Sequence, residues 1–280
     1  MALHGGFAGT ERWLHERDPA AHPTILSGDI NTLNNPDDNV YHVITATADI
    51  TETALLEGLT IYSGNANGNG EDGLGGGLFN QGGSPTLINV TFVGNAADRG
   101  GGIYSAEGSP TLVNVALSGN AAAHEGGGIY SLGGSPVLTN TTFSLNTASS
   151  GGALYSAAGS ALTLTNAILW GNSIGQIAGD ASNLTVGHSD VQGGCPAGAT
   201  CDQVINKDPQ FWNPEGEDGL AGTLDDDLRI YTTYRHPSPV IDAGSTDALP
   251  NDIWDLDSDE DLDEPIPFDL SGRWRQVGFT

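Results

Sequence analysis

The stretch GGGIYSAEGSPTLVNVALSGNAAAHEGGGIYS, residues Gly100 to Ser131, begins and ends with the same six letters. The repeated six letters are part of a longer repeat, in which an aromatic residue follows each glycine cluster. These aromatic residues are spaced 25, 26 and 25 positions apart: Phe79, Tyr104, Tyr130 and Tyr155. A fixed period of this size is the signature of a solenoid, in which each copy forms one coil and buries its apolar face only against its neighbours. The sequence therefore predicts a stack of coils.

Asparagine repeats with the same period in two series: Asn89, Asn114, Asn140 and Asn166, and Asn95, Asn120, Asn146 and Asn172. A row of exposed amides could bind sugar hydroxyls. Asparagine also tolerates the left-handed conformation of turns, and stacked amides hydrogen-bond into ladders along a solenoid axis. Because the spacing coincides with the corners of the repeat, we predict that both series are structural ladders.

The pattern inside each copy decides which solenoid forms. Short alternating segments such as GGGIYS, PTLVNV and VALSGN are separated by Gly, Asn and Ser-Pro corners, and no stretch has the period of a helix. This pattern excludes a leucine-rich repeat and predicts three short strands per coil, which is an all-β parallel β-helix of about 25 residues per coil. Ile103, Leu112 and Leu117 are expected to point into the core.

The chain divides into three parts by composition. Residues 1–23 are predicted to form an N-terminal cap, 24–194 the coils, and 195–280 an irregular, acidic, loop-rich segment packed on the helix. Acidic residues outnumber basic ones by 35 to 8, giving a formal net charge of −27. Such a surface repels nucleic acids and anionic lipids. No apolar run is long enough to span a bilayer, so we expect no direct membrane insertion.

The two cysteines, Cys195 and Cys201, flank the loop CPAGATC. Two free thiols in a reducing compartment are one interpretation. The short spacing and the Pro and Gly between them favour a disulfide-closed loop in an oxidising compartment.

Two acidic motifs in the C-terminal part are candidate metal sites. In EDGLAGTLDDD the candidate ligands surround two glycines, and in DLDSDEDLDE they alternate along the chain. The second motif fails the EF-hand pattern, since Glu260 and Ile266 stand where Gly and Glu are required. A solvated acidic surface is the alternative, but oxygen ligands in flexible loops suit Ca²⁺. The predicted calcium ligands are Asp218, Asp225, Asp226 and Asp227 in the first motif, and Asp255, Asp257, Asp259, Asp261 and Asp263 in the second.

An enzyme is the alternative to a structural protein. A polysaccharide lyase on this fold would need a Lys or Arg base on the coils, where Arg99 is the only basic residue apart from histidine. A glycoside hydrolase would need carboxylates at fixed separations on adjacent coils, and the few present fall at different corners. His124 beside Glu125 is a conceivable acid/base pair. We therefore predict no catalytic residues.

The order of motifs resembles bacterial right-handed parallel β-helix surface proteins of the choice-of-anchor type. The strings that carry the resemblance are GGFAGTERWLHERDPAAHPTILSGDI, LLEGLTIYSGNANG, the GGGIYS…SPTLVNV…GN coils, DPQF, DGLAGTLDDDLRI and SPVIDAG. The resemblance implies a pectate-lyase-like fold, secretion and attachment to the cell surface, and it implies no defined reaction.

These observations together predict an extracellular, calcium-stabilised β-helix with a structural or adhesive role. Its expected partners are copies of itself joined end to end, or a surface glycan. End-to-end growth is expected because strand sequence before GGF is nearly absent, which would leave the first coil open to strand addition.

Overall fold

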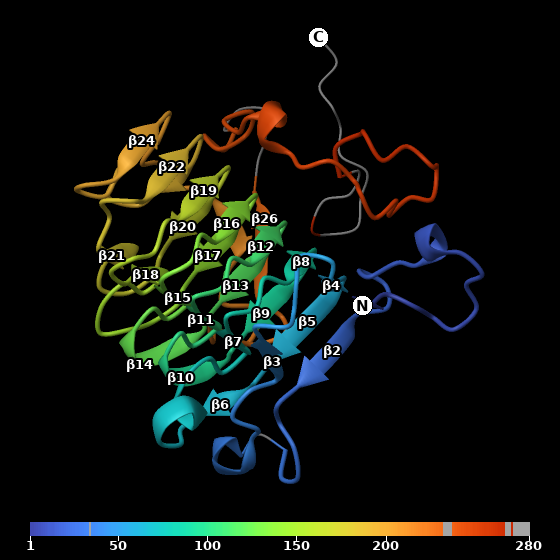
Figure 1. The fold of residues 1–280 in the computed structure, drawn as a ribbon, viewed down its shortest axis with the longest axis horizontal. Coiled ribbons are helices and arrows are strands. Elements are labelled where there is room, and N and C mark those ends of the chain that lie inside the picture. The colour runs from blue at the N-terminus through green and yellow to red at the C-terminus, as the bar shows by residue number, and fades with distance from the viewer. Residues whose placement is uncertain (34, 232–236, 267–269, 271–280) are drawn as a thin grey trace.

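The computed structural model of the 280-residue chain describes residues 1–33, 35–231, 237–266 and 270. The chain winds into a parallel β-helix, as the repeat predicts, and the helix is right-handed, as the family resemblance implies (Figure 1). Each full coil contributes one strand to each of three long parallel sheets, here called sheets A, B and C. Apolar and polar residues alternate within each short strand, and glycine or asparagine stands at the corners between strands. Strands this short must be joined by tight turns, which these residues allow.

Sheet A contains β1 (Ala2–His4), β4 (Leu55–Glu57), β8 (Thr86–Ile88), β12 (Thr111–Val113), β16 (Val137–Thr139), β19 (Thr163–Thr165), β22 (Thr185–Gly187) and β24 (Thr200–Asp202). Sheet B contains β2 (Thr24–Ser27), β5 (Leu59–Tyr62), β9 (Thr91–Val93), β13 (Ala116–Ser118), β17 (Thr142–Ser144), β20 (Ile168–Trp170) and β23 (Asp190–Val191). Sheet C contains β3 (Ile44–Thr47), β7 (Leu78–Gln81), β11 (Ile103–Ala106), β15 (Ile129–Leu132), β18 (Leu154–Ser156) and β21 (Ile177–Gly179).

Smaller elements complete the fold. A short parallel sheet joins β6 (Asn65–Ala66), β10 (Ala96–Arg99) and β14 (Ala121–Glu125), and an antiparallel pair joins β25 (Phe211–Asn213) and β26 (Asp227–Ile230). The 3-10 helices are η1 (Leu14–Glu16), η2 (Pro36–Asp38), η3 (Gly70–Gly73) and η4 (Thr246–Ala248). Within the described residues, no helix is long and apolar enough to cross a membrane.

The core lies inside the coils and repeats with them. Ile103 pairs in register with Leu78 on one side and Ile129 on the other. Ile103, Leu112 and Leu117 are each at most 1% exposed, as predicted for inward positions. The same inward position on each coil therefore stacks on its equivalents to form one continuous apolar core.

The coil strands extend beyond both ends of 24–194. Strand β1 pairs with β4, so the first residues supply a strand of sheet A as well as a terminal segment. Strand β24 pairs with β22 and continues sheet A past residue 194. Trp13, in the segment between these strands, is 55% exposed.

The described part of the C-terminal segment runs back along the outside of the coils (Figure 1). The backbone of Gly222 packs against Gly94 and Gly119 at the ends of β9 and β13. Farther along, the backbone of Ser245 hydrogen-bonds to the side chain of Asn166. Leu256 and Ile266 then pack on the outer face of sheet A, against Leu55, Ile88 and Val113.

Candidate functional sites

The asparagines form two hydrogen-bonded ladders. In the inner ladder, the side-chain amide of each residue donates to the next, over 2.9 Å from Asn95 to Asn120, 2.9 Å from Asn120 to Asn146 and 2.8 Å from Asn146 to Asn172. In the outer ladder each side-chain amide donates to the preceding asparagine instead, at corners whose φ lies between 53° and 56°; its members are Asn89, Asn114, Asn140 and Asn166. These amides are engaged along the axis, which is a structural role.

The aromatic series forms a stack of rings on sheet C. Ring centroids are 5.8 Å apart from Phe79 to Tyr104, 5.2 Å from Tyr104 to Tyr130 and 5.3 Å from Tyr130 to Tyr155. His42 extends the stack at its N-terminal end, 5.0 Å from Phe79. The rings stack face to face because in-register strands place identical positions directly above one another.

Each aspartate of the first acidic motif has a protein partner, and the Thr223 hydroxyl lies within hydrogen-bond distance of Asp218, Asp225 and Asp226. Asp225 accepts hydrogen bonds from Thr223 and from the backbone of Glu217, which lower its pKa. Asp226 accepts from the Ser118 hydroxyl at 2.5 Å, and burial raises its pKa. Asp227 is paired with Arg229. Asp218 accepts from the backbone of Leu220. In the described residues, no three carboxylates converge at this motif.

Residues 250–266, here called the acidic loop, form a closed turn around the second motif. An antiparallel bridge between Asn251 and Pro265 closes its neck, and the backbone N–H of Asp252 donates to Glu264 at 2.7 Å. Leu256 and Ile266 are fully buried against sheet A and fix the loop there. The loop therefore has a defined conformation on the first coils.

Three carboxylates converge inside the acidic loop. One oxygen from each of Asp252, Asp257 and Glu264 lies within 4.8 Å of the others, and Asp255, Asp257 and Asp259 form an overlapping group. Asp252 is fully buried and Asp257 is 9% exposed. Asp252 Oδ1, Asp257 Oδ1 and Glu264 Oε1 are buried without a hydrogen-bond partner in the described structure. Burial, then the neighbouring carboxylates, raise the pKa of Asp252 and of Glu264. This arrangement could hold a metal ion.

The sequence motif identified part of this cluster. Asp255, Asp257 and Asp259 converge, whereas Asp261 and Asp263 are exposed and belong to neither group. Asp252 and Glu264, at the two sides of the loop neck, were missed. They lie twelve residues apart, and only the pairing across the neck brings them together.

The cysteines form the disulfide Cys195–Cys201. Cys201 lies in β24, opposite Val186, so the bond closes a loop at the last strand of sheet A. The Glu125 carboxylate accepts a 2.6 Å hydrogen bond from Arg99, and among the described residues no hydrogen bond joins its side chain to His124. The structure therefore gives no support to an acid/base pair at this corner.

Comparison with known proteins finds one family. The Chlamydia polymorphic membrane protein repeat matches residues 89–106 and 140–157. Each matched stretch begins at an outer-ladder asparagine and contains an inner-ladder asparagine, a glycine cluster and a stacked tyrosine. No curated protein and no solved structure matches the chain. The similarity agrees with a β-helical repeat, and the choice-of-anchor type stays a prediction.

Proposed function

We propose that this protein is an extracellular β-helix with a structural or adhesive role at a bacterial cell surface, stabilised by Ca²⁺ in the acidic loop. The repeat match supports the surface role, because the family is described as a membrane protein of Chlamydia. The disulfide is consistent with an oxidising compartment outside the cytoplasm.

The observation that supports a bound metal ion is the set of carboxylate oxygens in the acidic loop that have no hydrogen-bond partner. Leaving three buried carboxylate oxygens without a donor is costly, and a cation removes that cost. Calcium–oxygen distances of about 2.3–2.6 Å are compatible with ligand atoms within 4.8 Å of one another. Ca²⁺ also accepts irregular geometry and completes its shell with backbone carbonyls and water, which suits a loop.

Calcium should stabilise the protein against heat. Ca²⁺ at about a hundred times its dissociation constant adds about 2.7 kcal/mol to the free energy of unfolding, which corresponds to a rise of roughly 5 °C in Tm. Calorimetry of the chelator-treated protein, repeated after addition of Ca²⁺ or Mg²⁺, measures this rise. Proteolysis of the acidic loop should slow in parallel, because the ion joins its two sides.

Two matched variants test the position of the ion. Asp252→Asn removes a buried ligand and should abolish most of the calcium-dependent rise. Asp263→Asn removes the same charge from the exposed side of the loop and should preserve it. Equal melting temperatures of the wild-type protein with chelator and with Ca²⁺ would refute a structural ion.

We further propose that the molecules assemble end to end. Strands β1, β2 and β3 are the terminal strands of sheets A, B and C, and in the described structure their outer edges pair with no other strand. At the opposite end, β24, β23 and β21 are the terminal strands, and of these β23 has an isolated parallel bridge from Asp190 to Ile205. If the edge strands at one end of a molecule pair with the edge strands at the other end of the next molecule, the contact is head-to-tail. Repeated contacts of this kind generate a filament.

A further inference from the structure

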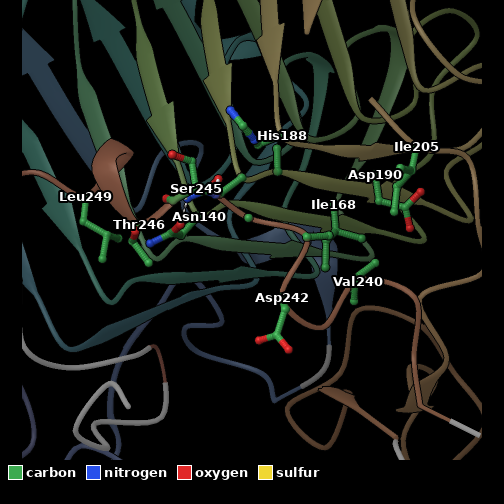
Figure 2. A pocket seen from close by; sticks show the side chains of 14 residues that line it. Asn140, Ile168, His188, Asp190, Ile205, Val240, Asp242, Ser245, Thr246 and Leu249 are labelled. Carbon is green, nitrogen blue, oxygen red and sulfur yellow. Dashed lines mark hydrogen bonds between the residues drawn. The ribbon is translucent and has the colours of Figure 1, made fainter. Parts of the chain in front are cut away.

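The hairpin of β25 and β26 is anchored to the rest of the protein at both strands. Just before β25, the carbonyl of Pro209 accepts a hydrogen bond of 2.7 Å from the Ser238 hydroxyl. The chain beyond Ser238 lies on the late coils, where residues 240–249 and the coils line a cavity of about 300 Å³ (Figure 2). Just before β26, the Asp226 carboxylate accepts a hydrogen bond of 2.5 Å from Ser118 in β13. The hairpin is therefore fixed at two points, which lowers the entropy lost when a ligand binds.

The hairpin presents two aromatic side chains to solvent. Trp212 is 60% exposed and Tyr231 is 45% exposed. Their ring centroids are 5.0 Å apart, and the ring planes are inclined by 51°. Phe211 and Ile230, which pair across the hairpin, are only partly exposed. Two large rings that contact each other and water form an apolar surface that the fold itself leaves uncovered.

An ion pair lies beside these rings. The strand pairing places Arg229 across the hairpin from Trp212. Arg229 donates to the Asp227 carboxylate from Nε at 2.9 Å and from Nη2 at 2.5 Å, and these hydrogen bonds lower the pKa of Asp227. The Arg229 side chain is 70% exposed. The pair therefore offers hydrogen-bond donors and acceptors next to the aromatic surface, with no net charge.

This combination matches the chemistry of a neutral sugar. A pyranose ring of β-linked glucose has C–H groups on both faces and hydroxyls around its edge, so its faces pack on an aromatic ring while its hydroxyls donate and accept hydrogen bonds. The net charge of −27 disfavours acidic glycans. A stable protein interface covers roughly 800 Å² on each partner, which is more than two rings and one ion pair provide.

We propose that Trp212, Tyr231 and the Asp227–Arg229 pair bind a neutral β-linked glucan, with one pyranose ring packed on the Trp212 indole and its hydroxyls bonded to the ion pair. The proposal rests on the adhesive role proposed above and gives that role a glycan partner. The site is separate from the acidic loop and does not depend on the calcium ion.

NMR titration of the labelled protein tests the glucan directly. Cellohexaose and laminarihexaose are the neutral probes, and the β-1,4-linked hexamer of glucuronic acid is the charged counterpart of cellohexaose. At least one neutral probe should give a saturable shift of the Trp212 indole N–H signal. The glucuronic acid hexamer should bind at least tenfold more weakly than cellohexaose if cellohexaose is the neutral probe that binds.

Two tryptophan variants separate this site from general contact with exposed rings. Trp212→Ser should weaken glucan binding at least tenfold. Trp13→Ser is the matched control, because Trp13 is 55% exposed and has the Arg12 guanidinium 5.4 Å from its ring centroid, but packs on no second aromatic ring among the described residues. It should leave binding unchanged. Both side chains are exposed, so both variants should keep the wild-type melting temperature.

The outcomes distinguish failure of this site from failure of the adhesive role. No saturable shift with either neutral probe, or wild-type affinity in Trp212→Ser, would overturn the glucan site. Attachment of protein-coated beads to bacterial cells measures adhesion separately. Attachment that Trp212→Ser leaves unchanged would refute the site and leave the adhesive role in place. Attachment lost in Trp212→Ser without any glucan binding would indicate a protein partner and would also overturn the proposal.

Discussion

The buried Asp190 carboxylate, which forms no ion pair among the described residues, makes the stability of this protein depend on pH. The pKa of Asp190 is raised from its ordinary value of 3.8 to about 6, mainly by burial. In the folded state the group therefore keeps its proton over a pH range in which the unfolded chain has already lost it. Ionisation favours the unfolded chain, so the free energy of unfolding falls as pH rises through this range and remains lower above it.

Asp190→Asn should remove this dependence. Raising the pKa from 3.8 to about 6 corresponds to about 3 kcal/mol, so the stability of the variant relative to wild type should increase by about that amount between pH 4 and pH 8. Denaturant unfolding at both pH values measures the difference, and subtraction cancels the other carboxylates. The exposed control Asp202→Asn should show a change near zero. A pH-independent difference for Asp190→Asn would show that the carboxylate is not strained by burial.

Residues within the repeat could be predicted from sequence, and residues outside it could not. Asn120 and Tyr104 recur at one period, and in-register stacking alone dictates what they contact. Asp190 is covered by a segment far away in the chain, and Asp252 and Glu264 are brought together only by the pairing across the neck of the acidic loop. No local pattern encodes such docking, so their burial became visible only in the folded structure.

At the scale of elements, glycine lets the C-terminal segment approach the corners of sheet B. Gly94 and Gly119 directly follow strands β9 and β13, with φ of 59° and 57°, and the backbone of Gly222 lies directly against both. The hydrogen bond from Ser118 to Asp226 lies beside this contact. The alternation of apolar and polar residues predicted the short strands. Which corners of the coils the C-terminal segment contacts could not be predicted, because that depends on how the segment docks.

Gly119→Ala should detach this loop. A Cβ at position 119 would overlap the backbone nitrogen of Gly222 and would also occupy a left-handed conformation. We expect a loss of about 3 kcal/mol and faster proteolysis near residue 222. Gly70→Ala is the matched control, since φ is 66° there and a Cβ would contact nothing within 4 Å. It should cost about 1 kcal/mol. Similar losses for both variants would mean that the contact contributes little.

At the scale of the whole molecule, calcium should promote end-to-end assembly. The net charge of −27 opposes association at low salt, and divalent cations reduce that repulsion. Electron microscopy and light scattering should show filaments growing in millimolar Ca²⁺. Ile25→Glu places a charge at an exposed position of the edge strand β2 and should suppress them. Uniform monomers at every calcium concentration would exclude axial assembly.

The return of the C-terminal segment along the coils has a consequence for how the molecule comes apart. In a solenoid whose repeats touch only their neighbours, the terminal coils can fray one at a time. Here one segment contacts Leu55, Ile88 and Val113 on early coils and Asn166 on a later one. Unravelling an early coil therefore also releases contacts made by its neighbours. The segment acts as a lengthwise tie that favours all-or-none unfolding and lets the body bear a pull along its axis as a single unit.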